Sequence, residues 1–426
     1  MESAHRSEKG TALRNEDTCL AVPDRGLFLV CDGLGGEKGG TLASRLAGEG
    51  LVEWVGRMQP LIERIKAAPK KEERLALERE LNLGFQETSR RIFEAAAEDK
   101  GLHGMCSTID VLLVMGTHAL VGHVGSGRVY LSRGGEAHLL TEDHTQLGYL
   151  RRVGKLAEVP PAEQASYAKR LTRAVGFRAE VKVDFLWVEL EEKDRFLLLT
   201  DGVWQGLGEA TTLSMATAPG SARELVDRMA LTVDSAGGRD NHTSLVVIPD
   251  WKAPAAEVLP ATAEQKIKML GRVPAFEYLS YQELLKVLSV GELLKVKSGA
   301  ALCREGDAGG EMMLILSGSA DISKNGRILR SLKPSEVFGE MSMLDNSVRS
   351  ATVVASSATN LLAFPRATLF ELFREDANLS VKFLWGVTME MNRKLRMASN
   401  ELVGKPAGEG TDAGAGKGPL PFHRSL

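Results

Sequence analysis

A short segment rich in proline and alanine divides this sequence into two parts. Residues 249–263 read PDWKAPAAEVLPATA, and repeated prolines cannot continue a helix or a central strand. A chain of 426 residues is long enough for two or three domains. We therefore expect a first domain over residues 1–249, a linker over 250–263 and a second domain over 264–402. The Gly/Pro-rich tail over 403–426 is expected to be disordered.

Both expected domains contain short apolar runs bounded by glycine, aspartate or asparagine, a pattern typical of strands and turns. In the first part the runs are 27–31, 111–114, 119–124, 196–199 and 244–248. Residues 42–51 and 61–97 have apolar side chains at helical spacing, so sheets interrupted by long helices predict an α+β fold. In the second part, helical patterns over 264–290, 368–373 and 379–402 flank strand-like runs, as in an antiparallel barrel or jelly roll.

The charge balance excludes a broad electrostatic binding surface. Lysine and arginine number 53 against 56 aspartates and glutamates, whereas nucleic-acid binders usually carry a basic excess. No apolar run approaches the roughly 20 residues that span a bilayer. The four cysteines lack CxxC spacing, so neither a zinc site nor a disulfide framework is indicated. We expect a cytoplasmic protein that binds neither nucleic acid nor membrane.

Acidic residues follow several of the strand-like runs in the first part. The segments are Asn15-Glu16-Asp17, Cys31-Asp32-Gly33, Thr200-Asp201-Gly202 and Arg239-Asp240-Asn241. A single Asp-Gly pair more often marks a turn. Carboxylates at several strand ends can nevertheless converge in space, and such hard oxygen ligands suit Mg²⁺ or Mn²⁺. Two such ions about 4 Å apart would hold a hydroxide in line for attack on phosphorus.

Eight ordered blocks between about residues 5 and 249 resemble the metal-dependent Ser/Thr protein phosphatases of type 2C. The blocks are 15–17, 31–36, 104–108, 121–125, 140–145, 171–176, 200–204 and 237–241. The resemblance implies a β-sandwich flanked by helices, with two Mn²⁺ or Mg²⁺ ions at one end. It also implies direct attack by a metal-bridging water on a phosphorylated protein, without a phosphoenzyme.

The same resemblance implies a role for each acidic residue. Asp32 would bridge both ions, with the carbonyl of Gly33 beside it. The other implied ligands are Asp201 and Asp240 on one ion, with Glu16 and Asp17 on ion-held waters. Asp32, Asp201 and Asp240 are therefore the expected catalytic residues.

Two positions depart from the family pattern. The family's phosphate-gripping arginine is replaced by Ala12, with Arg14 nearby as a weak candidate for phosphate binding. The aspartate associated with a third metal is replaced by Ser126. His144 and His242 could transfer protons, but such histidines more often make structural hydrogen bonds. A general acid is not assigned.

A second candidate site lies in the second part, between Val337 and Thr352. A carboxylate at Glu340 can accept a ribose hydroxyl, and the guanidinium of Arg349 can bind phosphate oxygens in a forked geometry. The small residues Ser350 and Ala351 would let backbone N–H groups reach the phosphate. The alternative is an ordinary Glu–Arg surface ion pair.

This segment, VFGEMSMLDNSVRSAT, resembles the phosphate-binding cassette of cyclic nucleotide-binding domains, and residues 305–307 and 314–318 match that domain's barrel blocks. The resemblance covers about residues 268–400 and implies a β jelly-roll with flanking helices. By this resemblance Gly339 and Glu340 contact the ribose, and Arg349 and Ser350 the cyclic phosphate. The effector could be cAMP or cGMP.

Two functions follow as hypotheses. The first is a protein serine/threonine phosphatase regulated by cAMP or cGMP. The second is a weakly active or inactive phosphatase-like scaffold that senses the nucleotide, supported by Ala12 and Ser126. An apolar stripe on the last helix, from Val381 to Leu395, could form a homodimer seam.

Overall fold

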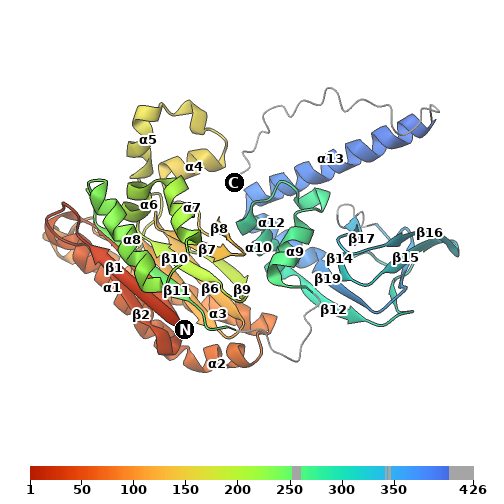
Figure 1. Ribbon diagram of the computed structural model, residues 1–426, viewed down its shortest axis with the longest axis horizontal. Helices are drawn as coiled ribbons and strands as arrows, with labels where there is room; N and C mark the ends of the chain where they lie inside the picture. The colour runs from red at the N-terminus through yellow and green to blue at the C-terminus, as the bar shows by residue number, and fades with distance from the viewer. Residues whose placement is uncertain (252–260, 341–342, 344–346, 403–426) are drawn as a thin grey trace. The chain divides into compact units, whose positions relative to one another are not determined.

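The computed structural model describes residues 1–251, 261–340, 343 and 347–402. The chain forms two compact units, Met1–Pro254 and Ala255–Leu426 (Figure 1). Most of the expected linker and the whole expected tail lie outside the described residues. Each unit has its own sheets and its own hydrophobic core.

Unit 1 is a sandwich of two antiparallel sheets, as the α+β prediction expected. One sheet has the order β1-β11-β10-β7-β8 and the other β2-β3-β5-β6-β9, with β4 paired to β3. The strands of the first sheet are β1 (Glu2–Glu8), β7 (Arg128–Arg133), β8 (Glu136–Leu139), β10 (Arg195–Leu199) and β11 (His242–Ile248). Those of the second are β2 (Asp17–Val22), β3 (Leu27–Leu34), β4 (Cys106–Ser107), β5 (Ile109–Met115), β6 (His118–Val124) and β9 (Asp184–Glu189).

Helices cover both outer faces of the sandwich (Figure 1). The second sheet is covered by α1 (Gly36–Arg57), α2 (Gln59–Ala67) and α3 (Lys71–Glu98). The first is covered by α6 (Asp201–Leu207), α7 (Glu209–Thr217) and α8 (Ala222–Ser235). Alternate strand residues such as Leu27 and Leu29 are fully buried against α1 and α3.

Two expectations about this unit need correction. Residues 61–97 are two helices and not one, because the chain breaks at Ala68-Pro69-Lys70; Ala68 is extended, as a residue before proline prefers to be. The polar segment Glu2–Glu8 was not predicted as a strand, yet β1 pairs with β11 along its whole length.

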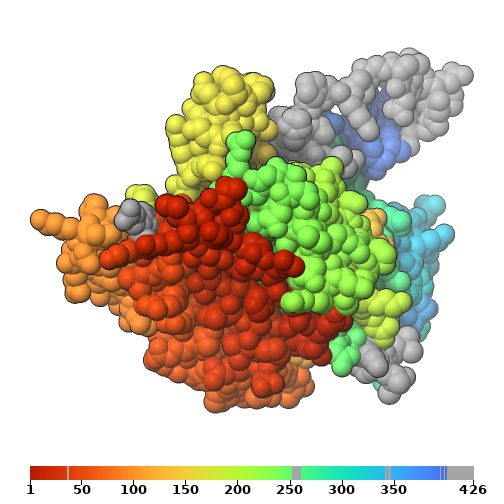
Figure 2. All heavy atoms as spheres, turned by 60° about the vertical axis from the view of Figure 1, so that its left-hand side comes forward, coloured from red at the N-terminus to blue at the C-terminus, as the bar shows by residue number. Residues whose placement is uncertain are grey.

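A small flap interrupts unit 1 between β8 and β9. It contains α4 (Gln146–Arg152), the short turn Leu156–Glu158 and α5 (Pro161–Ala168). Figure 2 shows it as a yellow knob that stands out from the body of the unit. Its base is held by a β-bridge between Thr145 and Leu171.

Unit 2 contains two four-stranded antiparallel sheets, which fits the expected jelly roll. Their orders are β12-β19-β14-β17 and β13-β18-β15-β16. The strands are β12 (Glu292–Val296), β13 (Ala301–Cys303), β14 (Glu311–Ser317), β15 (Ala320–Lys324), β16 (Arg327–Leu332), β17 (Val337–Phe338), β18 (Thr352–Ala355) and β19 (Thr359–Pro365). Residues such as Ile315 and Leu361 form the core between the sheets.

Among the described residues, the helices that flank these sheets are α9 (Ala263–Leu270), α10 (Tyr281–Val290), α12 (Arg366–Glu375) and α13 (Ala377–Leu402). The expected helical stretch 264–290 is divided by a turn at Pro274–Phe276. Lys382 of α13 donates to both carboxylate oxygens of Glu283 in α10 at 2.9 and 2.8 Å, and both side chains are buried. This ion pair fixes the start of α13 against α10.

Candidate active site

Four carboxylates gather at one end of the unit 1 sandwich. Asp17, the first residue of β2, is the register partner of Asp32 in β3. Asp201 begins α6 directly after β10, and its carboxyl forms a hydrogen bond with that of Asp32. Asp240 lies just before β11, and its charge acts on the other three. The structure thus brings together four residues that are far apart in the sequence.

Burial and mutual repulsion raise the pKa values of these carboxyls. Burial, with the charges of Asp201, Asp17 and Asp240, raises the pKa of Asp32 well above its ordinary value. Burial and the charge of Asp240 raise the pKa of Asp201 to about 6. Burial raises the pKa of Asp17 to about 7, although hydrogen bonds from two threonines oppose the rise. The cluster is therefore stable only with bound protons or with added positive charge.

The donor set of this cluster fits a hydrated divalent cation. Asp17 Oδ2 accepts hydrogen bonds from the hydroxyls of Thr243 (2.7 Å) and Thr200 (3.0 Å). Its Oδ1 is buried and has no hydrogen-bond partner among the residues that the structure describes. Within the part of the chain that the structure describes, no group of three or more His, Cys, Asp or Glu side chains is placed to hold a metal ion by itself. Mg²⁺ and Mn²⁺ do not need one, since they keep several waters and take few protein oxygens.

Gly33 lies where no side chain fits. A Cβ atom there would come within 1.9 Å of the Gly40 carbonyl oxygen and 2.8 Å of the Glu16 carbonyl oxygen. The Gly33 N–H donates to that Glu16 carbonyl at 3.2 Å. Burial raises the pKa of the Glu16 side chain, the charge of Arg14 lowers it, and that of Asp240 raises it. Gly33 and Glu16 therefore lie beside the carboxylates.

Asn241 has a role that the sequence motif alone did not reveal. Its Oδ1 accepts from the Glu16 N–H at 2.8 Å, and its Nδ2 donates to the carbonyls of Lys9 (2.9 Å) and Arg14 (2.8 Å). One buried amide thus binds the 9–16 segment to the start of β11. The Asn next to Asp240 was the only signal that could have suggested this.

The structure shows the surroundings of Ala12 and Ser126, the two positions that depart from the family pattern. Ala12 is partly buried, and Arg14 is exposed with its charge toward Glu16. Ser126 is buried, and its carbonyl accepts from Trp204 Nε1 at 3.0 Å. Trp204 in turn stacks under the guanidinium of Arg128, whose carbon lies 3.6 Å from the ring centroid. Position 126 therefore carries no carboxylate toward the cluster.

His144 belongs to a buried polar network. Its Nδ1 accepts from the Gly125 N–H at 3.1 Å, so the proton is on Nε2, which donates to Asp184 at 2.9 Å. Arg173 also donates to Asp184, at 2.7 Å. Burial lowers the pKa of His144 to about 4, with the charge of His123 acting in the same direction. The imidazole is neutral at neutral pH.

His242 is buried behind Asp240. Its Nδ1 donates to the Asp240 backbone carbonyl at 3.1 Å, and its Nε2 lies 3.3 Å from Asp234 Oδ1 in α8. This contact fixes the backbone of Asp240 relative to α8, a positioning role.

In unit 2 the structure places Gly339 against Arg349. Gly339 has a φ of 83°, and a Cβ atom there would lie 2.3 Å from Arg349 Nη1. Arg349 is buried, and its backbone exchanges hydrogen bonds with the 306–307 turn at 2.9 and 2.8 Å. Ser350 is exposed, whereas Glu340 and Ala351 are partly buried. Residues 341–342 and 344–346 of the cassette lie outside the described residues.

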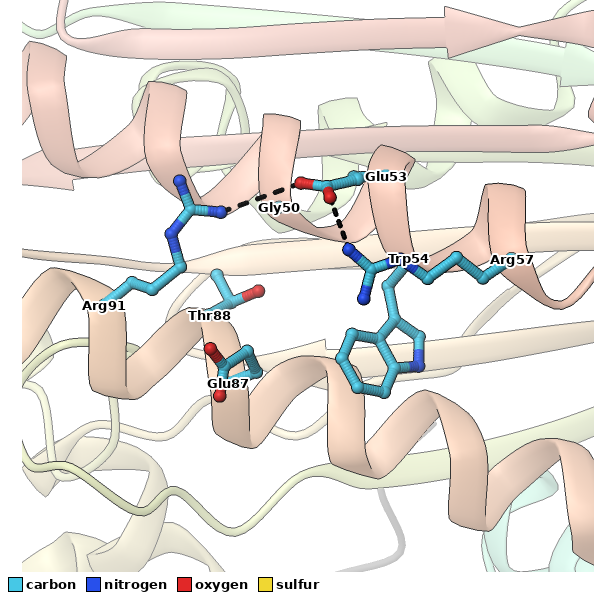
Figure 3. A pocket seen from close by; sticks show the side chains of 7 residues that line it. All are labelled: Gly50, Glu53, Trp54, Arg57, Glu87, Thr88 and Arg91. Atoms are coloured by element: carbon cyan, nitrogen blue, oxygen red, sulfur yellow. Dashed lines mark hydrogen bonds and ion pairs between the residues drawn. The ribbon is translucent and has the colours of Figure 1, made fainter.

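A groove of about 210 Å³ lies elsewhere on unit 1, between α1 and α3 (Figure 3). Glu53 pairs with Arg57 and, at 3.9 Å, with Arg91, and the Arg57 guanidinium lies 5.4 Å from the Trp54 ring. The lining residues are Gly50, Glu53, Trp54, Arg57, Glu87, Thr88 and Arg91. None of them belongs to the carboxylate cluster.

None of the described helices is both long and apolar enough to cross a membrane.

Comparison with known proteins agrees with both units. Residues 5–244 match the family described as Protein phosphatase 2C, and residues 293–376 match the Cyclic nucleotide-binding domain. The chain is similar to protein phosphatase PhpP of Streptococcus pneumoniae, with 27% identity over 52% of this chain and 85% of that protein. It is also 27% identical to the serine/threonine phosphatase stp of Listeria welshimeri, over 57% and 90% of the two chains.

A solved structure shows the same fold. Stp1 from Staphylococcus aureus superposes with a TM-score of 0.50 at 21% identity, covering 58% of this chain and 95% of that one. The family match spans more than half of the sequence. The chain therefore belongs to the protein phosphatase 2C family and carries a C-terminal cyclic nucleotide-binding domain.

Proposed function

We propose that this protein is a divalent-cation-dependent phosphatase that hydrolyses phosphoserine or phosphothreonine in a phosphorylated protein. The observation that carries the proposal is the cluster of Asp17, Asp32, Asp201 and Asp240, in which a buried oxygen of Asp17 finds no hydrogen-bond partner within the described part of the chain. A cluster of this kind requires positive charge, and hard oxygen donors favour Mn²⁺ or Mg²⁺.

Each residue has a proposed role. Asp32, Asp201 and Asp240 would hold two cations, helped by the carbonyl of Gly33, while Glu16 and Asp17 would bind ion-held waters. When bound, such ions supply a water of lowered pKa as nucleophile and neutralise charge on the phosphoryl group. Catalysis would then depend on Asp32, Asp201 and Asp240.

Other residues hold this arrangement in place. The hydroxyls of Thr200 and Thr243 orient Asp17, and Asn241 fixes the segment that carries Glu16. His242 fixes the backbone of Asp240. Support of this kind keeps ligand oxygens close to their working positions before the cation arrives.

The test is Mn²⁺-dependent hydrolysis of p-nitrophenyl phosphate and of a phosphothreonine peptide by the full chain. In Asp32→Asn we expect kcat to fall by about a hundredfold or more, because several kcal/mol of charge stabilisation are lost. Asp24→Asn is the matched control, since Asp24 is exposed in the turn before β3. Equal turnover by wild type and Asp32→Asn would refute the proposal.

In unit 2 we propose a site for cAMP or cGMP, formed by Gly339, Glu340, Arg349, Ser350 and Ala351. The close approach of the Arg349 guanidinium to Gly339 supports it, since a buried arginine suits a phosphate ligand. Nucleotide binding there would regulate the phosphatase.

A cytoplasmic location is proposed because all four cysteines are unpaired thiols.

We also propose that α13 pairs with a second copy of the chain. Leu384, Met391 and Leu395 are 53%, 55% and 65% exposed, and the spacing from 384 to 391 is one heptad. Light scattering on the full chain would detect the dimer, and a monomeric mass at micromolar concentration would contradict it.

One observation favours the second candidate function, a weakly active or inactive scaffold. Ser126 offers no carboxylate where the family has an aspartate, and its carbonyl is bound by Trp204. Nucleotide binding together with no Mn²⁺-dependent turnover would establish this alternative.

A further inference from the structure

The flap returns to the sandwich at Lys169, close to the carboxylate cluster. Just beyond it, the Arg170 carbonyl accepts from the Gln146 N–H at 2.8 Å, and Thr145 and Leu171 form a β-bridge. The backbone next to Lys169 is thereby held on the sandwich. The lysine side chain itself is 63% exposed.

The Lys169 ammonium faces the cluster. Its Nζ lies 3.4 Å from Oδ2 of Asp240, whose side chain is 56% exposed. Burial and the charge of Asp240 raise the pKa of Asp201, and the charge of Lys169 partly offsets that rise. The lysine therefore contributes positive charge to the open side of the cluster.

Three arginines of the flap and its base have acidic partners away from the cluster. The pairs are Arg151–Asp143 (3.9 Å), Arg152–Glu142 (3.6 Å) and Arg173–Asp184 (2.7 Å). Lys169 differs because its carboxylate partner is a proposed cation ligand. A divalent cation held by the Asp240 oxygens would take this partner away from the ammonium, which would then be available for another acceptor.

The Lys169–Asp240 ion pair contributes little to the stability of the fold, because both side chains are largely exposed. Exposed ion pairs contribute about 0–1 kcal/mol. At the candidate site, in contrast, Ala12 carries no charge at the position where the sequence resemblance leads us to expect a phosphate-binding arginine, and the charge of Arg14 acts on Glu16. Lys169 places an exposed positive charge beside Asp240, on the solvent-facing side of the cluster.

We propose that Lys169 is a phosphate-binding residue, whose ammonium releases Asp240 when the divalent cation binds and then donates to the phosphoryl oxygens of the substrate. This inference rests on the proposed phosphatase function and assigns the substrate-phosphate contact to the flap. An ammonium offers three donors on a flexible stem, so it can leave one oxygen and reach another nearby.

The experiment uses the full chain loaded with Mn²⁺ and compares wild type with Lys169→Met, Lys169→Arg and Lys155→Met. Lys155 is a matched control, since it is an exposed flap lysine whose side chain has no contact with the cluster among the described interactions. Three quantities are measured: the affinity for inorganic phosphate by calorimetry, the affinity for Mn²⁺ without phosphate, and KM and kcat for a phosphothreonine peptide.

In Lys169→Met we expect phosphate affinity to fall about tenfold and KM to rise by a similar factor, the loss typical of a charge-assisted hydrogen bond. We expect Mn²⁺ affinity to stay equal or to increase, because a competing positive charge has been removed. Lys169→Arg should restore phosphate binding, and Lys155→Met should match wild type.

Unchanged phosphate affinity in Lys169→Met would overturn the inference, as would a loss of Mn²⁺ affinity that accounts for the weaker phosphate binding. A wild-type chain that does not bind phosphate would also overturn it. The proposed function fails on a different result, the absence of Mn²⁺-dependent turnover by wild type.

Discussion

His144 is a neutral imidazole enclosed by polar partners. It accepts a backbone hydrogen bond from Gly125 and donates one to Asp184, so neither ring nitrogen is available for another proton. Burial lowers its pKa to about 4, against about 6.5 in an unfolded chain. A histidine of this kind stabilises the fold only while it stays neutral.

We predict that this effect makes unit 1 sensitive to mild acid. Below pH 6.5 the unfolded chain binds a proton that the folded His144 does not, so the contribution is complete above pH 6.5 and is lost as the pH falls toward 4. At pH 5.5 the loss is about 1 kcal/mol. The free-energy gap between wild type and His144→Gln should therefore narrow by that amount between pH 7.5 and 5.5.

Urea unfolding of the full chain, followed by tryptophan fluorescence, measures that gap. His103→Gln, at an exposed position, is the control and should give the same difference at both pH values. A gap for His144→Gln that does not change with pH would contradict the assignment.

At the scale of elements, β1 shows how a polar segment becomes a strand. Glu2–Glu8 has little apolar character, yet all seven residues pair with β11. Ala4 packs against the cluster formed by α8 and the first sheet, whereas its neighbour His5 is exposed. The pairing is favoured because the backbone N–H and C=O groups at the edge of β11 need hydrogen-bond partners. Every second side chain of β1 also points toward the core.

We predict that Ala4→Asp destabilises unit 1 by about 2 kcal/mol, because it places an unpaired carboxylate against an apolar cluster. His5→Asp introduces the same side chain one residue further on, on the solvent face, and should change stability by less than about 0.5 kcal/mol. Thermal unfolding of both variants makes the comparison. Equal losses in the two would show that β1 does not pack as described.

The elements that the sequence predicted are those with strong local patterns. The runs at 27–31 and 119–124 lie within β3 and β6, since apolar residues bounded by turn residues reflect burial directly. The β1 strand was missed because its pairing partner is more than 230 residues away. The break at Pro69 was missed because apolar periodicity continues on both sides of it.

The residues of the candidate site also fall into two groups, those that the sequence predicted and those that it did not. Asp32, Asp201 and Asp240 stand out in the sequence because acidic residues at strand ends carry their own signal. Asn241 and Lys169 do not, because their importance comes from contacts with Glu16 and Asp240 that only the folded sandwich creates.

At the scale of the whole molecule, a substitution of Arg349 can separate nucleotide binding by unit 2 from phosphatase activity of unit 1. We predict that cAMP or cGMP at a hundred times its Kd stabilises unit 2 by about 2.7 kcal/mol. Arg349→Lys should weaken binding at least about tenfold, because a lysine cannot make the forked contact with phosphate. Mn²⁺-dependent turnover without nucleotide should not change in this variant.

Calorimetric titration with each nucleotide measures the affinity and distinguishes cAMP from cGMP. Arg330→Lys is the control, since Arg330 is exposed on β16 and pairs with Glu336 at 3.0 Å. Equal affinity in wild type and Arg349→Lys would place the nucleotide elsewhere. A nucleotide effect on turnover in wild type that disappears in Arg349→Lys would show that the units are coupled.

The raised pKa values of Asp17 and Asp201, about 7 and about 6, have a practical consequence. Near neutral pH these carboxyls carry protons part of the time, and a cation that binds the cluster must displace them. The released protons are taken up by the buffer. The heat recorded for metal binding therefore includes the ionisation heat of the buffer. The heats measured in Tris and in PIPES should differ by the number of protons expelled multiplied by the difference between the ionisation heats of the two buffers.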